Sequence, residues 1–534
     1  MKITYLGHAG FIAETAAEVV VIDPWLSPEG AFDMSWFQFP CNHHLLAPTV
    51  DLIKNTEKKV YVYISHHHQD HFDRDFLRQI TAYPVTLVIP NFRRKSLSDG
   101  IEALGFETVK LMEDNEKIPL QDGYLRVFVD DHELNRDSAL LLNDSGFNFL
   151  DLNDCKIFDR VARITQDNGH IHVFTCQHSG AVWHPACYDY ETAQYQKIAK
   201  SKLAGKFRAV ANAISTLRPD WYLPSAGPPC FLDPDLIHLN FQEITTFTKQ
   251  DKIVSYVSDR VKDTKTRELN PGDIFDSQVL DFTHRAQNGI TAAGLRPYIE
   301  AYAARCSEGI ERLRKSTPGE RCIDILDRLA QELRLKLDEF RVREDYDIRL
   351  VFGLLELPNR FVSLDLRENR VTFVDRLPES KYFVLMAPAW EIERVLNRDV
   401  TWEDFCLTFR VKLSRSPDTY DTLLQGFFQA EIEDVEPLCD RILEIRNSTG
   451  RITVEAGGCR YEIDAHCPHQ GGDLQYGWVE EDRYWVCPRH RWKYDLANGG
   501  RCISSNDSIH AQRSGHAQRS GHAQKSGQKI TKQA

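Results

Sequence analysis

The segment SHHHQDHFD, residues 65–73, places four imidazoles and two carboxylates directly after the apolar run VYVYI. Four of these side chains have the spacing H-x-H-x-D-H: His66, His68, Asp70 and His71. A turn after a strand can direct two imidazoles toward one metal ion and the adjacent Asp–His pair toward a second. Imidazole and carboxylate without thiolate suit Zn(II), Fe(II) or Mn(II), and not a closed cysteine-rich zinc site. The segment therefore predicts a metal centre for hydrolysis or for oxygen chemistry.

A second constellation lies far downstream, where two Cys–His pairs flank seventeen residues. The four side chains are Cys467, His469, Cys487 and His490. Two thiolates can bind one iron of a [2Fe–2S] cluster, and two neutral imidazoles can bind the other iron. Zinc would also accept two Cys and two His, but zinc fingers pair like ligands with like. The mixed pairs therefore predict an iron–sulfur cluster.

Composition indicates a large multi-domain protein. The chain has 534 residues, of which 42% are hydrophobic and 27% charged, and this length predicts roughly two to four domains. The net charge of −13 argues against a basic nucleic-acid-binding surface, and no long apolar run predicts a membrane span. The N-terminus lacks signal-peptide features, and the thirteen scattered cysteines suit reduced thiols. We expect a cytoplasmic protein without nucleic-acid or membrane partners.

Local patterns divide the chain into regions. Short apolar segments such as KITYLG, EVVVID and VTLVIP predict strands at the start, and residues 191–217 have helical spacing of apolar residues. A mixed helical and strand-like stretch follows, and then further short strands. The unit HAQRSG recurs at the C-terminal end, which predicts disorder. We expect an α+β multi-domain chain with boundaries at 1–245, 246–436 (an accessory α+β region), 437–505 and 506–534 (the disordered tail).

The first region resembles the metallo-β-lactamase fold, whose central motif is H-x-H-x-D-H. The resemblance implies an αββα sandwich and further metal-site residues in chain order. Asp23 resembles the Asp that braces the metal loop, His132 the third ligand of the first metal, and Asp154 the bridging carboxylate. The last histidine usual for this fold is missing near residue 225, where the chain reads YLPSAGPPCF. The nearest replacements by sequence are His178, His184, Cys230 and His238.

The C-terminal motif resembles an all-β Rieske domain, and HRWKYDLANGG resembles the ending of the ferredoxin and oxygenase type. The whole arrangement resembles the CMP-N-acetylneuraminate hydroxylase family, which joins these two domains. Shared segments are HAGF, DPWL, SHHHQDH, DDHELNRD, LNDC, QHSGAVWHP and LPSAG. Animal members of that family carry the Rieske domain first, whereas here it is C-terminal. The resemblance therefore does not fix a nucleotide-sugar substrate.

The two motifs together decide between hydrolysis and oxygen chemistry. Hydrolysis requires no electrons, whereas a Rieske cluster passes one electron at a time, so the histidine-rich centre should hold redox-active iron. We expect a monooxygenase with a [2Fe–2S] cluster and one or two non-haem irons, which hydroxylates a small polar substrate such as a nucleotide sugar or an amine. An external ferredoxin, cytochrome b5 or reductase would supply electrons. The predicted catalytic and metal-binding residues are His66, His68, Asp70, His71, His132 and Asp154.

Three other functions fit parts of the pattern. A flavodiiron-like O₂ or NO reductase uses the same scaffold, but its motif has Glu at the position of His68, and no flavodoxin-type phosphate loop is visible here. A zinc hydrolase with a redox-sensing Rieske appendage would hold zinc in the N-terminal domain. A non-catalytic electron carrier would use that domain only to bind partners. Metal content separates the hydrolase from the oxygenase, and substrate-free O₂ consumption would reveal the reductase.

Overall fold

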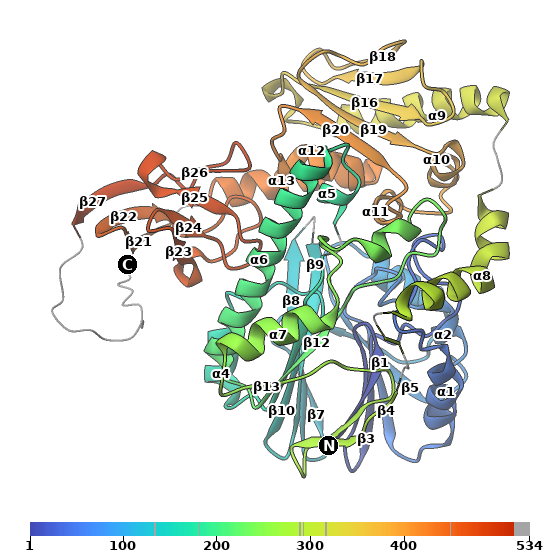
Figure 1. Ribbon diagram of the computed structural model, residues 1–534, viewed down its shortest axis with the longest axis vertical. Coiled ribbons are helices and arrows are strands. Elements are labelled where there is room, and N and C mark those ends of the chain that lie inside the picture. Colours follow the sequence, from blue (N-terminus) through green and yellow to red (C-terminus); the bar gives the residue numbers. More distant parts are fainter. Residues whose placement is uncertain are drawn as a thin grey trace.

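The computed structural model describes residues 1–132, 135–180, 182–287, 290–291, 293–314, 318–448 and 450–516. Two facing sheets form the N-terminal part, a five-stranded sheet with helices lies at one end of them, and a group of short strands packs at the side (Figure 1). Among the described residues, no helix is both long and apolar enough to cross a membrane.

The first N-terminal sheet has eight strands in the order β15-β14-β1-β2-β3-β4-β5-β6. They are β1 (Lys2–Gly7), β2 (Gly10–Glu14), β3 (Glu18–Ile22), β4 (Lys59–Tyr63), β5 (Val85–Pro90), β6 (Val109–Met112), β14 (Ile274–Asp276) and β15 (Asp281–His284). Strands β3 to β6 run parallel. Every side chain of β3 is buried, as expected for an EVVVI run that is covered on both faces of a parallel sheet. The H-x-H-x-D-H segment leaves the carboxyl end of β4.

The second N-terminal sheet has seven strands in the order β13-β12-β11-β10-β9-β8-β7. They are β7 (Lys117–Leu120), β8 (Gly123–His132), β9 (Asn135–Asp144), β10 (Phe147–Asp151), β11 (Val173–Gln177), β12 (Trp221–Ser225) and β13 (Lys265–Thr266). Apolar side chains of the two sheets meet in one buried core that includes Phe11, Val20, Leu140 and Phe149. The carboxyl ends of β3, β4, β8 and β10 lie at one edge of the sandwich. The polar residues at or after these strand ends therefore lie at that edge.

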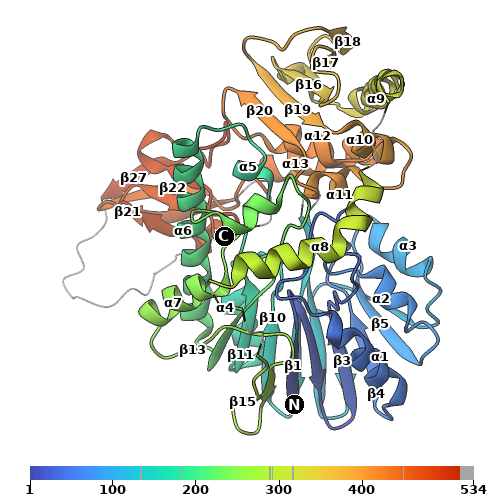
Figure 2. The same cartoon turned by 45° about the vertical axis from the view of Figure 1, so that its right-hand side comes forward.

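Helices cover the outer faces of both sheets (Figures 1 and 2). Those of the N-terminal part are α1 (Leu46–Asn55), α2 (Arg74–Arg78), α3 (Ser96–Glu102), α4 (Val161–Asn168), α5 (Trp183–Ala186), α6 (Thr192–Leu217), α7 (Gln250–Arg260) and α8 (Leu295–Leu313). One core joins α1 to α3 to the first sheet, and another joins α4, α6 and α7 to the second. The helix predicted over 191–217 is thus α6. The layers are helix, sheet, sheet and helix.

The accessory region is built on a sheet in the order β18-β17-β16-β19-β20. Its elements are β16 (Arg349–Leu354), β17 (Phe361–Asp365), β18 (Arg370–Val374), β19 (Tyr382–Ala387), β20 (Lys412–Ser416), α9 (Gly319–Glu339), α10 (Ala389–Leu396), α11 (Trp402–Leu407), α12 (Thr422–Gln429) and α13 (Val435–Arg446). Buried leucines of α9 and aromatic residues of α11 and α12 form the core. Trp25, Trp36 and Phe231 belong to the same core, so the accessory region is packed firmly on the N-terminal part.

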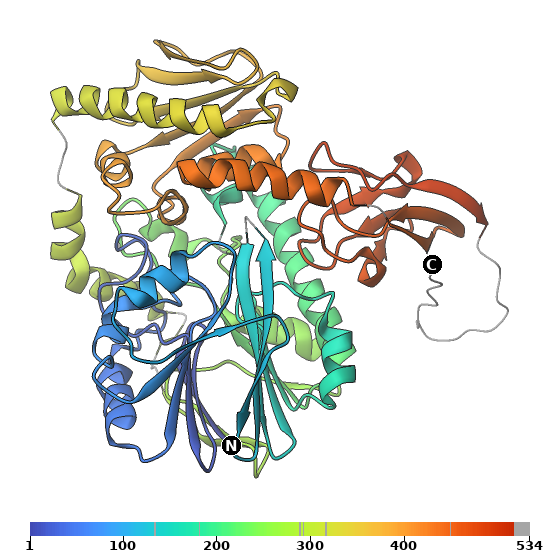
Figure 3. The same cartoon turned by 180° about the vertical axis from the view of Figure 1, so that it is seen from behind.

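The C-terminal region contains two small antiparallel sheets beyond the orange helix α13 (Figure 3). Their strands are β21 (Arg451–Ala456), β22 (Cys459–Asp464) and β27 (Gln512–His516), and β23 (Trp478–Glu480), β24 (Tyr484–Val486), β25 (Lys493–Asp495) and β26 (Arg501–Cys502). The loops after β22 and β24 carry the two Cys–His pairs. The two loops lie beside each other, because the rings of His469 and His490 have centroids 4.7 Å apart.

The structure departs from two of the predicted region boundaries. Strands β13, β14 and β15 join the N-terminal sheets, and α8 packs its buried Ile299 and Tyr302 against Phe37 and Cys230, so the N-terminal part extends well past residue 245. The predicted disordered tail also begins too early, because β27 pairs with the edge of β22. The remaining repeats, from residue 517 onward, lie outside the described residues.

Candidate metal centre and cluster site

A buried carboxylate braces the metal loop. Asp23 follows β3, and its two oxygens accept hydrogen bonds from the Ser65 backbone N–H (2.8 Å), the Ser65 hydroxyl (2.6 Å) and His71 Nδ1 (2.8 Å). Because Nδ1 of His71 donates its proton to Asp23, Nε2 presents a lone pair on the other side of the ring. A carboxylate that fixes an imidazole in this way is the usual support of a metal-binding histidine. Asp23 thus has the bracing position that the resemblance implies.

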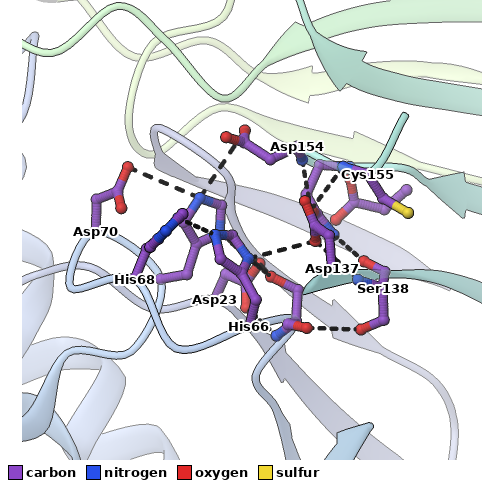
Figure 4. A network of polar contacts seen from close by, with 12 residues as sticks. Asp23, His66, His68, Asp70, Asp137, Ser138, Asp154 and Cys155 are labelled. Carbon is purple, nitrogen blue, oxygen red and sulfur yellow. Dashed lines mark hydrogen bonds and ion pairs between the residues drawn. The ribbon is translucent and has the colours of Figure 1, made fainter. Parts of the chain in front are cut away.

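Three predicted residues converge next to this brace. The ligand atoms of His66, His71 and Asp154 lie within 4.8 Å of one another. Figure 4 shows His66, from the loop after β4, and Asp154, from the segment after β10, near each other. His71 Nε2 and Asp154 Oδ1 are 3.9 Å apart, and both are buried without a hydrogen-bond partner among the described residues. Buried polar atoms are normally satisfied. A divalent cation between them would satisfy both atoms, so the residues fit a metal ion.

A second group shares His71 and includes a histidine that sequence reasoning missed. His8, Asp70 and His71 bring their ligand atoms within 4.8 Å, and His8 Nε2 is 3.0 Å from Asp70 Oδ2. His8 has a φ of 51°, an uncommon conformation for a residue other than glycine, and its carbonyl accepts a hydrogen bond from the Ala226 N–H (2.8 Å). His8 therefore lies beside the strand end that lacks the usual last histidine. In the sequence, the HAGF segment that contains His8 was the feature that could have indicated this residue.

Burial and neighbouring charges shift the pKa values of the acidic and basic side chains in this centre. Burial alone would lower the pKa of His71, but Asp70 and Asp23 raise it to about 10. Burial raises the pKa of Asp137, and the Asp154 charge raises it further. His66 has its pKa held well below the usual value, first by burial and then by His71. A metal cation would replace the proton on His71 and offset the carboxylate repulsion.

The two ring nitrogens of His68 contact different partners, one in the metal centre and one in the accessory region. Its Nδ1 is 2.8 Å from His66 Nε2, and its Nε2 is 3.3 Å from Glu403 Oε1. Glu403 lies on α11 of the accessory region and also meets His67 (3.2 Å) and Arg136 (2.7 Å). Arg136 and His67 hold the pKa of Glu403 well below its usual value despite burial. The accessory region thus supplies a carboxylate to the H-x-H-x-D-H segment.

The structure does not bring His132 to the other predicted ligands. His132 ends β8, and its Nε2 lies 3.2 Å from Asp130 Oδ1 and 2.9 Å from an Arg489 guanidinium nitrogen. Its ring faces the Rieske loops, because an added Cβ at Gly471 would be 3.5 Å from His132 Cε1. Of the four proposed replacements for the last ligand, none joins the metal-like groups of the described residues; they are His178, His184, Cys230 and His238.

A separate histidine pair near the surface does not qualify as a metal site. His170, His172 and Asp220 bring ligand atoms within 4.8 Å. However, His172 Nδ1 accepts a hydrogen bond from the Asn148 backbone N–H (3.0 Å). The proton of the neutral ring is therefore on Nε2, which leaves no lone pair for a cation.

The two Cys–His loops bring all four predicted cluster ligands together in two like pairs. The buried thiols of Cys467 and Cys487 interact with each other, and the His469 and His490 ring centroids are 4.7 Å apart. No three of these four ligand atoms lie within 4.8 Å of one another, whereas ligands of a single tetrahedral zinc are roughly 3.3–3.8 Å apart. Burial lowers the pKa of His469 to about 3, so the imidazole is neutral. The arrangement fits a two-iron cluster.

An arginine between the cluster ligands docks the Rieske loops on the N-terminal part. Arg489 Nη1 donates to Asp130 Oδ1 (2.7 Å), and Nε donates to Asp159 Oδ2 (2.8 Å). All three residues are buried. The Asp473 N–H also donates to Asp159 (3.0 Å). Because Arg489 lies between Cys487 and His490, this contact fixes the cluster loop against the end of β8.

Comparison with known proteins agrees with this architecture. Residues 2–186 match the model of the Beta-lactamase superfamily domain, and residues 444–511 match the Rieske [2Fe-2S] domain. A Mycolicibacterium smegmatis protein named "Putative Rieske 2Fe-2S iron-sulfur protein" is 28% identical over 95% of this chain and 98% of its own length. The chain therefore contains a metallo-β-lactamase-fold domain and, C-terminal to it, a Rieske domain, in the predicted order.

Solved structures with similar folds cover the N-terminal half. Igni18, a metallo hydrolase from Ignicoccus hospitalis, is 18% identical, with a TM-score of 0.33, over 52% of this chain and 98% of its own. CmlA, a diiron β-hydroxylase from Streptomyces venezuelae, is 16% identical, with a TM-score of 0.34, over 51% of this chain and 53% of its own.

Proposed function

We propose that the protein is a Rieske-coupled non-haem iron monooxygenase. When bound, the [2Fe–2S] cluster supplies electrons singly and iron activates O₂. The observation that carries the proposal is the docking of the cluster loops, through Arg489, on the strand that leads to the metal-binding edge. A purely hydrolytic centre has no use for a redox cluster held in this position.

The residues of the chain have distinct roles in this proposal. The iron would be held by the two groups that share His71, with Asp23 orienting that ring and Glu403 orienting His68. The residues of these two groups are His8, His66, Asp70, His71 and Asp154, and the predicted ligand His68 contacts His66 beside them. The cluster would be held by Cys467, His469, Cys487 and His490, with the Tyr494 hydroxyl 3.0 Å from Cys467 Sγ. The His132 ring at the end of β8 contacts Arg489 of the second cluster loop (2.9 Å).

The overall reaction requires partners outside the chain. Monooxygenation joins an organic substrate, O₂, two electrons and two protons to give a hydroxylated product and water. The cluster passes one electron at a time, so we propose that a ferredoxin, cytochrome b5 or a reductase binds twice per turnover. We propose that the substrate is a small polar molecule. That it is a nucleotide sugar, as the resemblance to the CMP-N-acetylneuraminate hydroxylase family implies, stays a prediction.

The first test is metal and redox analysis of anaerobically reconstituted protein. We expect about two acid-labile sulfides per chain, a Rieske-type EPR signal and iron beyond that of the cluster. Zinc in place of the additional iron, or the absence of the Rieske signal, would overturn the proposal and favour a hydrolase.

The second test removes the cluster and keeps the other centre. Cys467→Ser should abolish the Rieske signal, retain the N-terminal iron, and greatly slow re-reduction of that iron by a chemical donor that reduces the cluster. Cys459→Ser is the matched control, because Cys459 lies on β22 of the same domain and is not a predicted ligand. Equal rates of iron reduction in the two variants would contradict an electron relay.

A further inference from the structure

Helix α6 carries positive charge only. Its 26 residues include four lysines and one arginine, but neither Asp nor Glu. Asp and Glu make up 78 of the 534 residues of a chain whose net charge is −13, so a helix of this length without either is depleted in acid. Of the five cations, Lys206 is buried. The other four reach the surface, and they are Lys197, Lys200, Lys202 and Arg208.

Three of these cations form a stripe along the exposed side of α6. Lys197 and Lys200 are three residues apart, and Arg208 lies eight residues beyond Lys200, so all three lie near one side of the helix. The stripe ends at the Rieske region, because Arg208 pairs with one oxygen of Glu480 on β23. Lys493 of β25 binds the other oxygen of the same carboxylate (2.6 Å). The positive surface of α6 is therefore joined to the Rieske strands.

The same surface continues over β25 and β26 with a further cation and an apolar side chain. Ile503 directly follows β26, and its N–H donates to the Lys493 carbonyl (3.0 Å), so the two residues are cross-strand neighbours. The Ile503 side chain is 59% exposed. Arg501 lies two residues earlier, which places it on the same face of the strand, and it is also exposed. An apolar side chain surrounded by charged ones is the usual composition of a protein-binding surface.

The least buried cluster ligand lies next to this helix. His490 is half-buried, whereas the other three predicted cluster ligands are buried. The residue after it, Arg491, packs on α6, where its Cδ is 3.4 Å from the position of an added Cβ at Gly205. Figures 1 and 2 both show α6 beside the strands of the Rieske region. A protein bound on α6 would therefore lie close to the cluster.

The other side of the same cluster loop is closed to an external donor. Arg489 is buried there against Asp130 and Asp159 of the N-terminal part. Electrons that leave for the N-terminal metal centre would cross this contact. An external donor must therefore approach the cluster from a different side, and the side next to α6 combines positive charge with an exposed apolar residue.

We propose that the α6–Rieske face, formed by Lys197, Lys200, Arg208, Arg501 and Ile503, is the docking site of an acidic one-electron carrier protein. The net negative charge of the chain repels such a carrier over most of the surface, whereas this face attracts it and sets its orientation. One electron leaves the reduced carrier and enters the oxidised cluster. The docking site rests on the part of the proposed function in which an external protein reduces the cluster, and not on oxygenation.

The test measures reduction of the cluster in the oxidised holoprotein, anaerobically and without substrate. The donor is a reduced plant-type [2Fe–2S] ferredoxin, an acidic carrier whose potential lies below that of Rieske clusters. At about 0.01 M ionic strength, the double substitution Lys197→Glu with Lys200→Glu should lower the second-order rate constant by about tenfold or more, because electrostatic steering is lost. At about 1 M, where the Debye length is only about 3 Å, the wild-type and variant rates should converge.

Two controls separate docking from general effects of charge or folding. Lys54→Glu makes the same kind of change at an exposed position of α1, which covers the first sheet, whereas α6 covers the second. This variant should retain nearly the wild-type rate. Reduced methyl viologen, a small cation, should reduce the cluster of each variant at least as fast as that of the wild type, and this result shows that the cluster is intact.

Equal ferredoxin rates in the wild type and the double variant at low ionic strength would overturn the proposal, as would equal losses in the double variant and Lys54→Glu. If the double substitution instead abolishes binding to phosphatidylglycerol vesicles and leaves the ferredoxin rate unchanged, the stripe binds an anionic membrane and the docking site is wrong. Because neither O₂ nor substrate is present, the outcome is independent of the oxygenase proposal: ferredoxin reduction that depends on α6, in a protein with zinc in place of the N-terminal iron, would retain the docking site and end the monooxygenase.

Discussion

At the scale of single residues, the cluster site makes a direct prediction about redox potential. Tyr494 is fully buried, and its hydroxyl lies 3.0 Å from Cys467 Sγ. When the cluster is bound, the Tyr494 hydroxyl would donate a hydrogen bond to the Cys467 thiolate. This bond would favour the reduced cluster, which carries more negative charge. Tyr494→Phe should therefore lower the reduction potential by roughly 40 mV, the equivalent of about 1 kcal/mol for one electron.

Potentiometric titration followed by EPR measures this shift. Tyr484→Phe, on the neighbouring strand β24, is the control and should have the wild-type potential. A Tyr494→Phe potential equal to or above that of the wild type would show that the hydroxyl does not donate to the cluster.

The contact of Glu403 with His68 gives a second residue-level prediction. A carboxylate that orients a metal-binding imidazole contributes roughly 10–100-fold to metal affinity. Glu403→Gln should lower the affinity for iron by that factor and leave the Rieske signal intact. Iron retained after dialysis against a graded chelator measures the effect, and Glu433→Gln, at an exposed position, is the control. Equal iron retention in both variants would leave Glu403 without a role at the metal.

At the scale of elements, the junction between α10 and the N-terminal part should make stability depend on pH. Burial raises the pKa of Glu391 to about 7, although Arg410 (2.7 Å) opposes the shift. Below pH 4.5 the folded and unfolded states both hold this proton. Between pH 4.5 and 7 the unfolded state loses it while the folded state keeps it, so the free energy of unfolding falls by roughly 3 kcal/mol.

Denaturant titrations at a series of pH values test this dependence. Glu391→Gln cannot ionise, so its stability should fall less over this interval than that of the wild type. Glu393→Gln, on the same helix, should retain the wild-type profile. Identical slopes for all three proteins would mean that Glu391 does not carry the effect.

Local spacing predicted the elements and ligands that lie close together in sequence. The H-x-H-x-D-H string and the two Cys–His pairs are each held by a single turn or loop, so residue order is enough to identify them. His8 and Glu403 come from distant segments, and only the packing of β1 and α11 against the metal loop brings them there. His132 was assigned from the resemblance to the metallo-β-lactamase fold, but its ring contacts Arg489 of the Rieske region, a contact that no local pattern encodes.

At the scale of the whole molecule, Arg489 couples the Rieske region to the N-terminal part. Breaking a buried ion pair by removing one partner costs roughly 3–5 kcal/mol, because the remaining charges are left uncompensated. Arg489→Met would leave Asp130 and Asp159 in that state. We expect the Rieske region to undock, and electron transfer from the reduced cluster to the N-terminal iron to slow strongly, while the EPR signal of the cluster persists.

Arg483→Met is the matched control, since two nitrogens of the Arg483 guanidinium donate to the Asp495 carboxylate inside the Rieske region. Stopped-flow oxidation of the pre-reduced cluster by O₂ measures the transfer, and wild-type rates in Arg489→Met would show that this contact does not set the distance between the two centres.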